Sequence, residues 1–133
     1  MAVYWTIDSR QRLLTAVAEG VVRRDEMFAC IDAMAGAKAV GYRRLFDGSK
    51  AEADMTTEEI MEVAVELRRL QTVEPSGPGP LAIVVPAERF EQLARVFGVL
   101  AIPKRPMRFF QDAEAAQSWL ESPEIRDWAP EPA

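Results

Sequence analysis

The sequence of 133 residues predicts one α/β domain, built on a single mixed and mostly parallel β-sheet. The sheet is expected to begin with a β-hairpin and to carry about four helices, in the order ββαβαβαβα. Three patterns predict this class. Apolar and polar residues alternate near the N-terminus, as in a half-buried strand; several later segments space apolar residues as one helix face does; and residues 81–85 are apolar throughout, which is typical of a strand covered on both faces.

The first part of the chain is expected to form the hairpin and one helix. Residues 3–8 alternate, residues 8–11 are a polar turn, and a second strand runs from Leu13 until Gly20 ends it. A helix over residues 25–37 should follow. Its apolar face consists of Phe28, Ile31, Met34 and Ala35.

A third strand and a capped helix are predicted next. The strand covers residues 42–46 and is expected to end in a polar loop at Asp47 and Gly48. The Thr56 hydroxyl can accept a bond from an unpaired backbone N–H, and Glu59 can reach back to the Thr56 N–H, as in a capping box. The apolar stripe of this helix, which should cover the sheet, is Ile60, Val63, Ala64, Leu67 and Leu70.

The second half of the chain repeats the alternation of strand and helix. Proline and glycine interrupt residues 74–80, just before the apolar strand at 81–85. A helix is predicted over residues 87–101, followed by a last strand at 106–110. Asp112 is expected to cap a final helix.

Residues 1–122 are therefore predicted to be the domain, and residues 123–133 a flexible or docked tail that the core does not need. Prolines and acidic residues dominate this tail, and chain termini are usually weakly held. Trp128 is the complication, because an exposed indole is unfavourable. We expect it to dock on its own domain or on a neighbouring subunit, which leaves a homodimer open.

Composition excludes several functions. The chain has no histidine, which removes Ser-His-Asp and Cys-His catalysis and imidazole metal ligands. Its one cysteine, Cys30, cannot form an internal disulfide or a thiolate metal cluster, and its helical spacing with Met27 and Met34 favours buried packing over a reactive thiol. No glycine-rich phosphate loop is present. We therefore predict no enzyme activity, no cofactor and no metal.

Net charge and hydropathy limit the classes of partner that we expect and the cellular compartment. A net charge of −5, with arginines in scattered pairs such as Arg43–Arg44, argues against nucleic acid. No apolar run approaches the roughly 20 residues that span a bilayer. The N-terminus shows no export signal, and together with the single cysteine this favours the cytoplasm.

Over roughly residues 3–121 the chain resembles the STAS-like group, the SpoIIAA-like or anti-sigma-factor antagonist-like domains. The residues that carry the resemblance are Glu19-Gly20 at the end of the second strand, Leu45-Phe46-Asp47 at the end of the third, the capped helix, and Ile83-Val84-Val85. The resemblance implies a bacterial-type regulatory domain that binds a protein. Relatives carry a phosphorylatable serine in an Asp-Ser-Ser-Gly-like stretch, whereas this chain has Asp54-Met55-Thr56-Thr57-Glu58. Some relatives also resemble Sec14-type lipid-binding modules.

The first functional hypothesis is a surface that binds a protein partner, made by Asp47, Ser49, Thr56 and Thr57. Open α/β sheets commonly bind ligands at the carboxyl ends of parallel strands, where these residues are expected. Turn, loop and cap roles explain the same residue types. If the domain is switched covalently, the phosphate should be on Ser49, Thr56 or Thr57.

The alternative hypothesis is a pocket for a small apolar or lipid-like ligand, between the sheet and the helices of residues 56–71 and 87–101. Its candidate lining residues are Met61, Phe90, Leu93 and Phe97. Ordinary core packing accounts for the same apolar faces.

Overall fold

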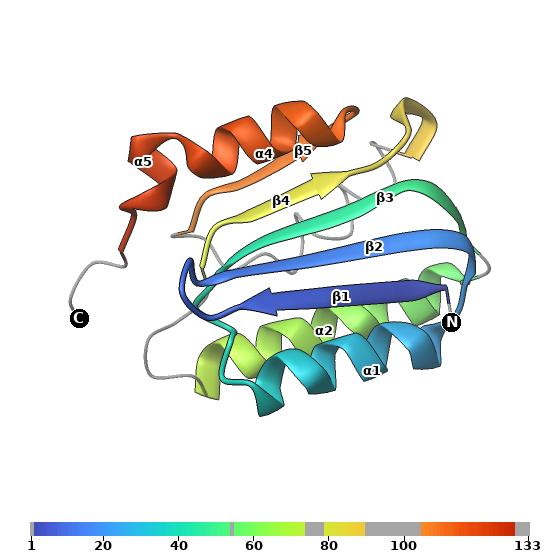
Figure 1. Ribbon diagram of the computed structural model, residues 1–133. Helices are drawn as coiled ribbons and strands as arrows, with labels where there is room; N and C mark the ends of the chain where they lie inside the picture. Colours follow the sequence, from blue (N-terminus) through green and yellow to red (C-terminus); the bar gives the residue numbers. More distant parts are fainter. Residues whose placement is uncertain (1, 54, 74–78, 90–104, 130–133) are drawn as a thin grey trace.

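The computed structural model describes residues 2–53, 55–73, 79–89 and 105–129, and its five-stranded sheet has the strand order β1-β2-β3-β4-β5 (Figure 1). The strands are β1 Val3–Asp8, β2 Leu13–Val22, β3 Arg43–Ala53, β4 Leu81–Val84 and β5 Met107–Phe110. β1 pairs antiparallel with β2, and the other three pairs are parallel. The predicted fold class and element order are confirmed.

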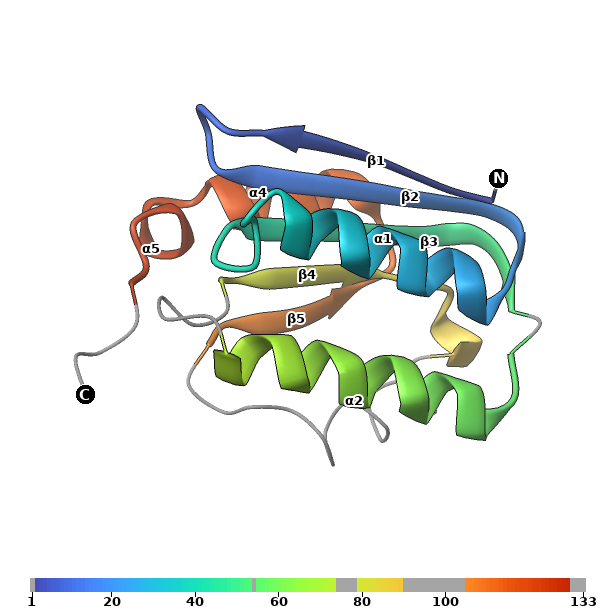
Figure 2. The same cartoon turned by 90° about the horizontal axis from the view of Figure 1, so that it is seen from below.

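Helices cover both faces of the sheet. On one face lie α1 Arg24–Gly36 and α2 Thr57–Val73, side by side; on the other lie α4 Ala113–Glu121 and the short α5 Pro123–Arg126 (Figures 1 and 2). A 3₁₀ turn, η1 Ala87–Arg89, follows β4. It begins where the helix of residues 87–101 was predicted, and the rest of that prediction falls outside the described residues.

The two faces have separate cores, because successive side chains of a strand point to opposite sides. Arg44 and Phe46 of β3 face α1 and α2, whereas Leu45 packs with α4. β4 lies between β3 and β5, so all four of its side chains are buried, as its continuous apolar sequence predicted.

The prediction that the third strand ends at Asp47 and Gly48 is wrong. β3 continues to Ala53, and after Asp47 it pairs with β2 alone. The pairing shifts where Ala18 lies opposite two β3 residues, Gly48 and Ser49, which is a β-bulge. The glycine resembles a turn in sequence, but its missing Cβ allows close packing: a Cβ there would lie 3.2 Å from a ring carbon of Phe46.

β2 also runs further than expected. It passes through Gly20, whose φ of +74° suits glycine, and ends at Val22. The pairing of β2 with β3 continues through Gly20. The prediction that Gly20 ends the second strand is therefore wrong, because a single glycine does not by itself end a strand.

The first part of the predicted tail, which was expected to be flexible or docked, forms α5. Ile125 is buried in the same core cluster as Leu120 and Ala116 of α4 and Val84 of β4. Pro123 lies in the first turn of this helix. A backbone N–H there has no partner within the helix, so the N–H that proline lacks is not missed. Trp128 is half-buried on the same chain, and residues 130–133 lie outside the described part.

Candidate functional site

The predicted partner residues fall into two separate local structures. Asp47 and Ser49 lie at the β3 bulge, where the Asp47 carboxylate accepts bonds from the Ser49 N–H at 3.0 Å and the Ser49 hydroxyl at 2.7 Å. Thr56 and Thr57 lie beyond the end of β3, at the start of α2. Among the hydrogen bonds of the described residues, none joins one pair to the other.

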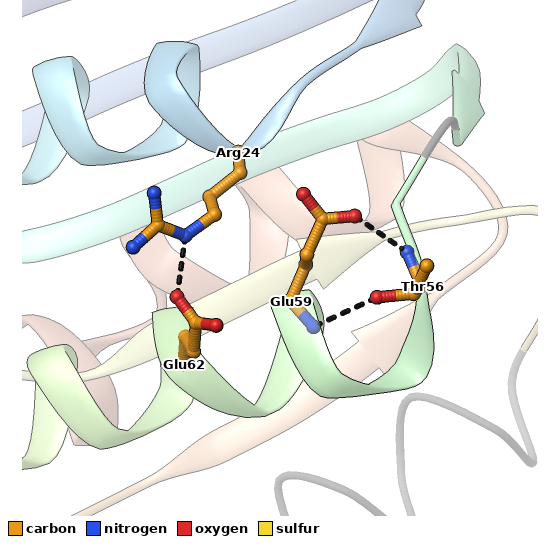
Figure 3. Close-up of polar contacts among 4 residues, drawn as sticks. All are labelled: Arg24, Thr56, Glu59 and Glu62. Carbon is orange, nitrogen blue, oxygen red and sulfur yellow. Dashed lines mark hydrogen bonds and ion pairs between the residues drawn. The ribbon is translucent and has the colours of Figure 1, made fainter.

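The predicted capping box of α2 is confirmed (Figure 3). The Glu59 N–H donates to the Thr56 hydroxyl oxygen at 3.1 Å, and the Thr56 N–H donates to the Glu59 carboxylate at 3.0 Å. One turn further on, Glu62 pairs with Arg24 at the start of α1, which ties the two helices together. Thr57 itself is exposed.

A shallow depression lies on the outer side of α1 and α2. Its lining residues are Phe28, Thr57, Glu58, Met61, Glu62, Val65 and Glu66. It brings together two residues that the sequence assigned to different sites, Thr57 and Met61. Val65 beside them is 54% exposed.

A cavity of about 170 Å³ lies beneath α1 and α2, against the sheet. Its described lining is almost wholly apolar and comes from β2, α1, β3, α2 and β4, with contributions from residues just outside them: Leu14, Ala16, Val22, Met27, Cys30, Ile31, Met34, Arg44, Leu45, Phe46, Gly48, Ala51, Met55, Ile60, Val63, Leu67, Leu81, Ile83, Val85 and Arg89. Met61 is not among these residues, because it faces the outer depression. Phe90, Leu93 and Phe97 lie outside the described residues.

Two charged residues, Arg44 and Arg89, are among the described lining residues of this cavity, and Arg44 is the fully buried one. It is 4% exposed, and its Nη1 donates to the thioether sulfur of Met34 at 3.2 Å, while its Nε and Nη2 have no hydrogen-bond partner. Burial, together with the smaller effect of the nearby charge of Arg105, lowers the pKa of Arg44 to about 9. The guanidinium therefore stays protonated at neutral pH.

Two neighbours of Arg44 share its buried setting. Arg105 precedes β5 and donates through Nη1 to the Gly79 carbonyl at 3.3 Å, while its Nε has no partner, and burial lowers its pKa to about 10. Burial raises the pKa of the Cys30 thiol to about 11, against the opposing effect of Arg44. Cys30 is buried, as predicted, and stays a neutral thiol.

The sequence analysis missed Arg44 because it treated Arg43–Arg44 as one of several scattered charged pairs. The position of the two arginines within a strand could have indicated their burial. Adjacent residues of a strand point to opposite faces of the sheet, so helices on both faces bury both arginines. Their environments differ. Arg43 donates to the carbonyls of Leu120 at 2.7 Å and Gln11 at 3.0 Å, whereas Arg44 meets an apolar cavity.

Within the described ranges, no group of three or more acidic or cysteine side chains is placed to hold a metal ion, and no helix has the length and apolarity to cross a bilayer.

The chain has a SpoIIAA-like fold, as the sequence predicted. It superposes on a crystal structure from Shewanella loihica PV-4, described as an uncharacterized protein from the DUF3478 family with a SpoIIAA-like fold, with a TM-score of 0.59. The two are 20% identical, and the match covers 90% of this chain and 93% of the other. At this identity the likeness shows the fold alone. No family model matches the sequence, and no curated protein matches it.

Proposed function

We propose that this protein is a non-catalytic binding module that takes a small apolar ligand into the cavity beneath α1 and α2. The observation that supports this most directly is the cavity itself, because ligand sites are typically concave and mostly apolar, as the described lining of this cavity is. Among the described lining residues of the cavity, those of α2 are Ile60, Val63 and Leu67.

The volume limits the ligand. An engineered apolar cavity of roughly 150 Å³ stays dry and binds benzene, so a cavity of this size suits molecules of about six to ten non-hydrogen atoms. A bound ligand would make dispersion contacts with the lining side chains that they lack in the empty cavity. These contacts would supply the binding energy.

The test uses two valines two residues apart on α2. Val63 is buried and lines the cavity, whereas Val65 is exposed on the outer side. We expect 1-hexanol to shift the NMR signals of cavity-lining methyl groups saturably, Val63→Phe to weaken this binding by about tenfold or more because the ring occupies the space, and Val65→Phe to leave it unchanged. Absence of saturable binding, or equal binding to both variants, would rule out the cavity as a ligand site.

A second candidate function is protein binding at the outer depression, which the exposed Val65 favours. Glu58, Glu62 and Glu66 surround its apolar residues, so the matching partner would present an apolar side chain among basic ones. Phosphorylation of Thr57 would add negative charge to the same surface, at a helix N-terminus that accommodates it. Ser49 and Thr56 remain the other predicted sites of modification.

We expect Thr57→Glu to change partner affinity without unfolding the domain, and Val65→Asp to release the partner. Thr56→Ala should instead lower the free energy of unfolding by about 1 kcal/mol, because the cap is lost whether or not the site is regulated. Native mass spectrometry of the protein purified from its own cells would detect a retained partner and its loss in each variant. A partner that stays bound to both Thr57→Glu and Val65→Asp would place the interface elsewhere, and Ser49→Glu then tests the β3 bulge.

A further inference from the structure

The buried guanidinium of Arg44 is the feature of the cavity that apolar binding alone leaves unexplained. A buried charge is costly unless an opposite charge and hydrogen bonds compensate it. Arg44 has one hydrogen bond, and the acceptor is a thioether sulfur, which is a weak acceptor. None of the described residues that line the cavity carries a carboxylate, although the whole chain has a net charge of −5.

The two unpartnered nitrogens of Arg44 are a matched pair. In arginine, the Nε–H and one Nη2–H point in parallel from the same edge of the planar group, and this edge accepts both oxygens of a carboxylate at once. Nη1, at the opposite edge, is the nitrogen bonded to Met34. The bond to Met34 therefore holds the plane of the guanidinium and leaves the two-donor edge unoccupied.

Two further arginines strengthen the local preference for an anion: Arg89 lines the same cavity, and the charge of Arg105 acts on Arg44. Arg105 is close enough to disfavour the charged form of Arg44, and the Nε of Arg105 is buried without a partner. Two positive charges held near each other in an apolar setting lower the energy of an anion placed between or beside them.

We propose that the ligand of this cavity is a small apolar monocarboxylic acid, whose carboxylate binds the Nε–Nη2 edge of Arg44 while its hydrocarbon part fills the space lined by Val63 and Leu67. This inference rests on the proposed apolar-ligand function and specifies the chemical class of the ligand. A single carboxylate matches one free guanidinium edge, and a hydrocarbon part of five or six carbons brings the molecule within the roughly six to ten atoms that the cavity holds. The acid could be free or the end of a larger acyl compound that enters by its head.

The first experiment compares hexanoate with 1-hexanol, hexylamine and acetate on the unchanged protein by calorimetry. We expect hexanoate to bind at least about tenfold more tightly than 1-hexanol, because only the acid pairs with Arg44, and hexylamine to bind more weakly than either. Acetate should bind more weakly than hexanoate, since it lacks the longer hydrocarbon chain. This comparison needs no variant and so does not depend on the folding of any mutant.

The second experiment removes the charge. Arg44→Met keeps much of the side-chain volume, and Arg68→Met is its control, because it deletes the same charge from an exposed position on α2. We expect Arg44→Met to bind hexanoate and 1-hexanol equally, and to unfold at a higher temperature than the ligand-free parent because an uncompensated charge has left the interior. Arg68→Met should keep the preference for hexanoate.

The outcomes separate this inference from the function on which it rests. Equal binding of hexanoate and 1-hexanol to the unchanged protein would overturn the carboxylate assignment and leave an apolar-ligand site. Failure of all four probes to bind would overturn the ligand site and the assignment together. A preference for hexanoate that survives in Arg44→Met would show that another group receives the carboxylate, and would also overturn the assignment.

Discussion

Gly79→Ala is expected to destabilise the fold more than alanine at Gly20, Gly36 or Gly48. A Cβ at Gly79 would lie 2.2 Å from the carbonyl oxygen of Tyr42 and 2.5 Å from that of Gly41, and both are backbone atoms that no rotamer change can move. Gly79 is also held on both sides, because its N–H donates to the Val40 carbonyl at 3.2 Å and its own carbonyl accepts from Arg105. Overpacking costs typically about 1–3 kcal/mol, and a clash with two fixed carbonyls should reach or exceed the upper end.

Thermal and urea denaturation would measure this loss as a Tm lower by on the order of 10 °C. Gly36→Ala is the matched control. Gly36 ends α1, and a Cβ there would meet nothing within 4 Å, so alanine should keep or slightly raise the stability through its better helix propensity. A Gly79→Ala protein with the stability of the parent would mean that the segment before β4 does not pack on residues 41–42.

Ile125→Ala is expected to lower the free energy of unfolding by about 2–5 kcal/mol, the range for removing a buried isoleucine side chain. Ile125 is 5% exposed and closes the core between α4 and the sheet. Ending the chain at Ser122 should cost at least as much, because it also removes the backbone bonds of α5, such as Ile125 N–H to Ser122 carbonyl at 3.1 Å.

Two controls accompany this prediction. Glu124→Ala changes an exposed residue of the same helix and should stay within about 0.5 kcal/mol of the parent. A chain that ends at Ala129 retains α5 and should also match the parent. Equal stability of the chains that end at Ser122 and Ala129 would support the sequence-based view of a dispensable tail.

The sequence predicted the fold well because its signals were local and mutually consistent. The Thr56–Glu59 capping box and the apolar stripe of α2 both follow from spacing along one helix, and the Asp112 cap does as well. Strand ends were harder to predict. At Gly48 and Gly20 a glycine serves a bulge or an unusual φ inside a continuing strand, and sequence alone does not separate that role from a turn.

The candidate site was predicted only in outline. A pocket between sheet and helices could be inferred from the apolar faces of the helices. Which residues line it depends on how each helix is rotated about its axis when it packs on the sheet. Met61 faces outward, whereas Ile60 and Val63 line the cavity. Arg44 could not be singled out by composition, since arginine is mostly exposed, and its burial is a consequence of tertiary structure.

The order of the strands in the sheet is the same as their order in the chain, and this bears on how the protein folds. Each strand pairs with the strand that precedes it in the chain and can use that strand as its template. The β1–β2 hairpin has the shortest loop to close and is expected to form first, with one strand and helix added at a time toward the C-terminus. During synthesis the chain emerges in this same direction, so each strand meets a finished edge as it leaves the ribosome. The edge offered by β4 is the last to be covered, because β5, α4 and α5 follow it in the chain.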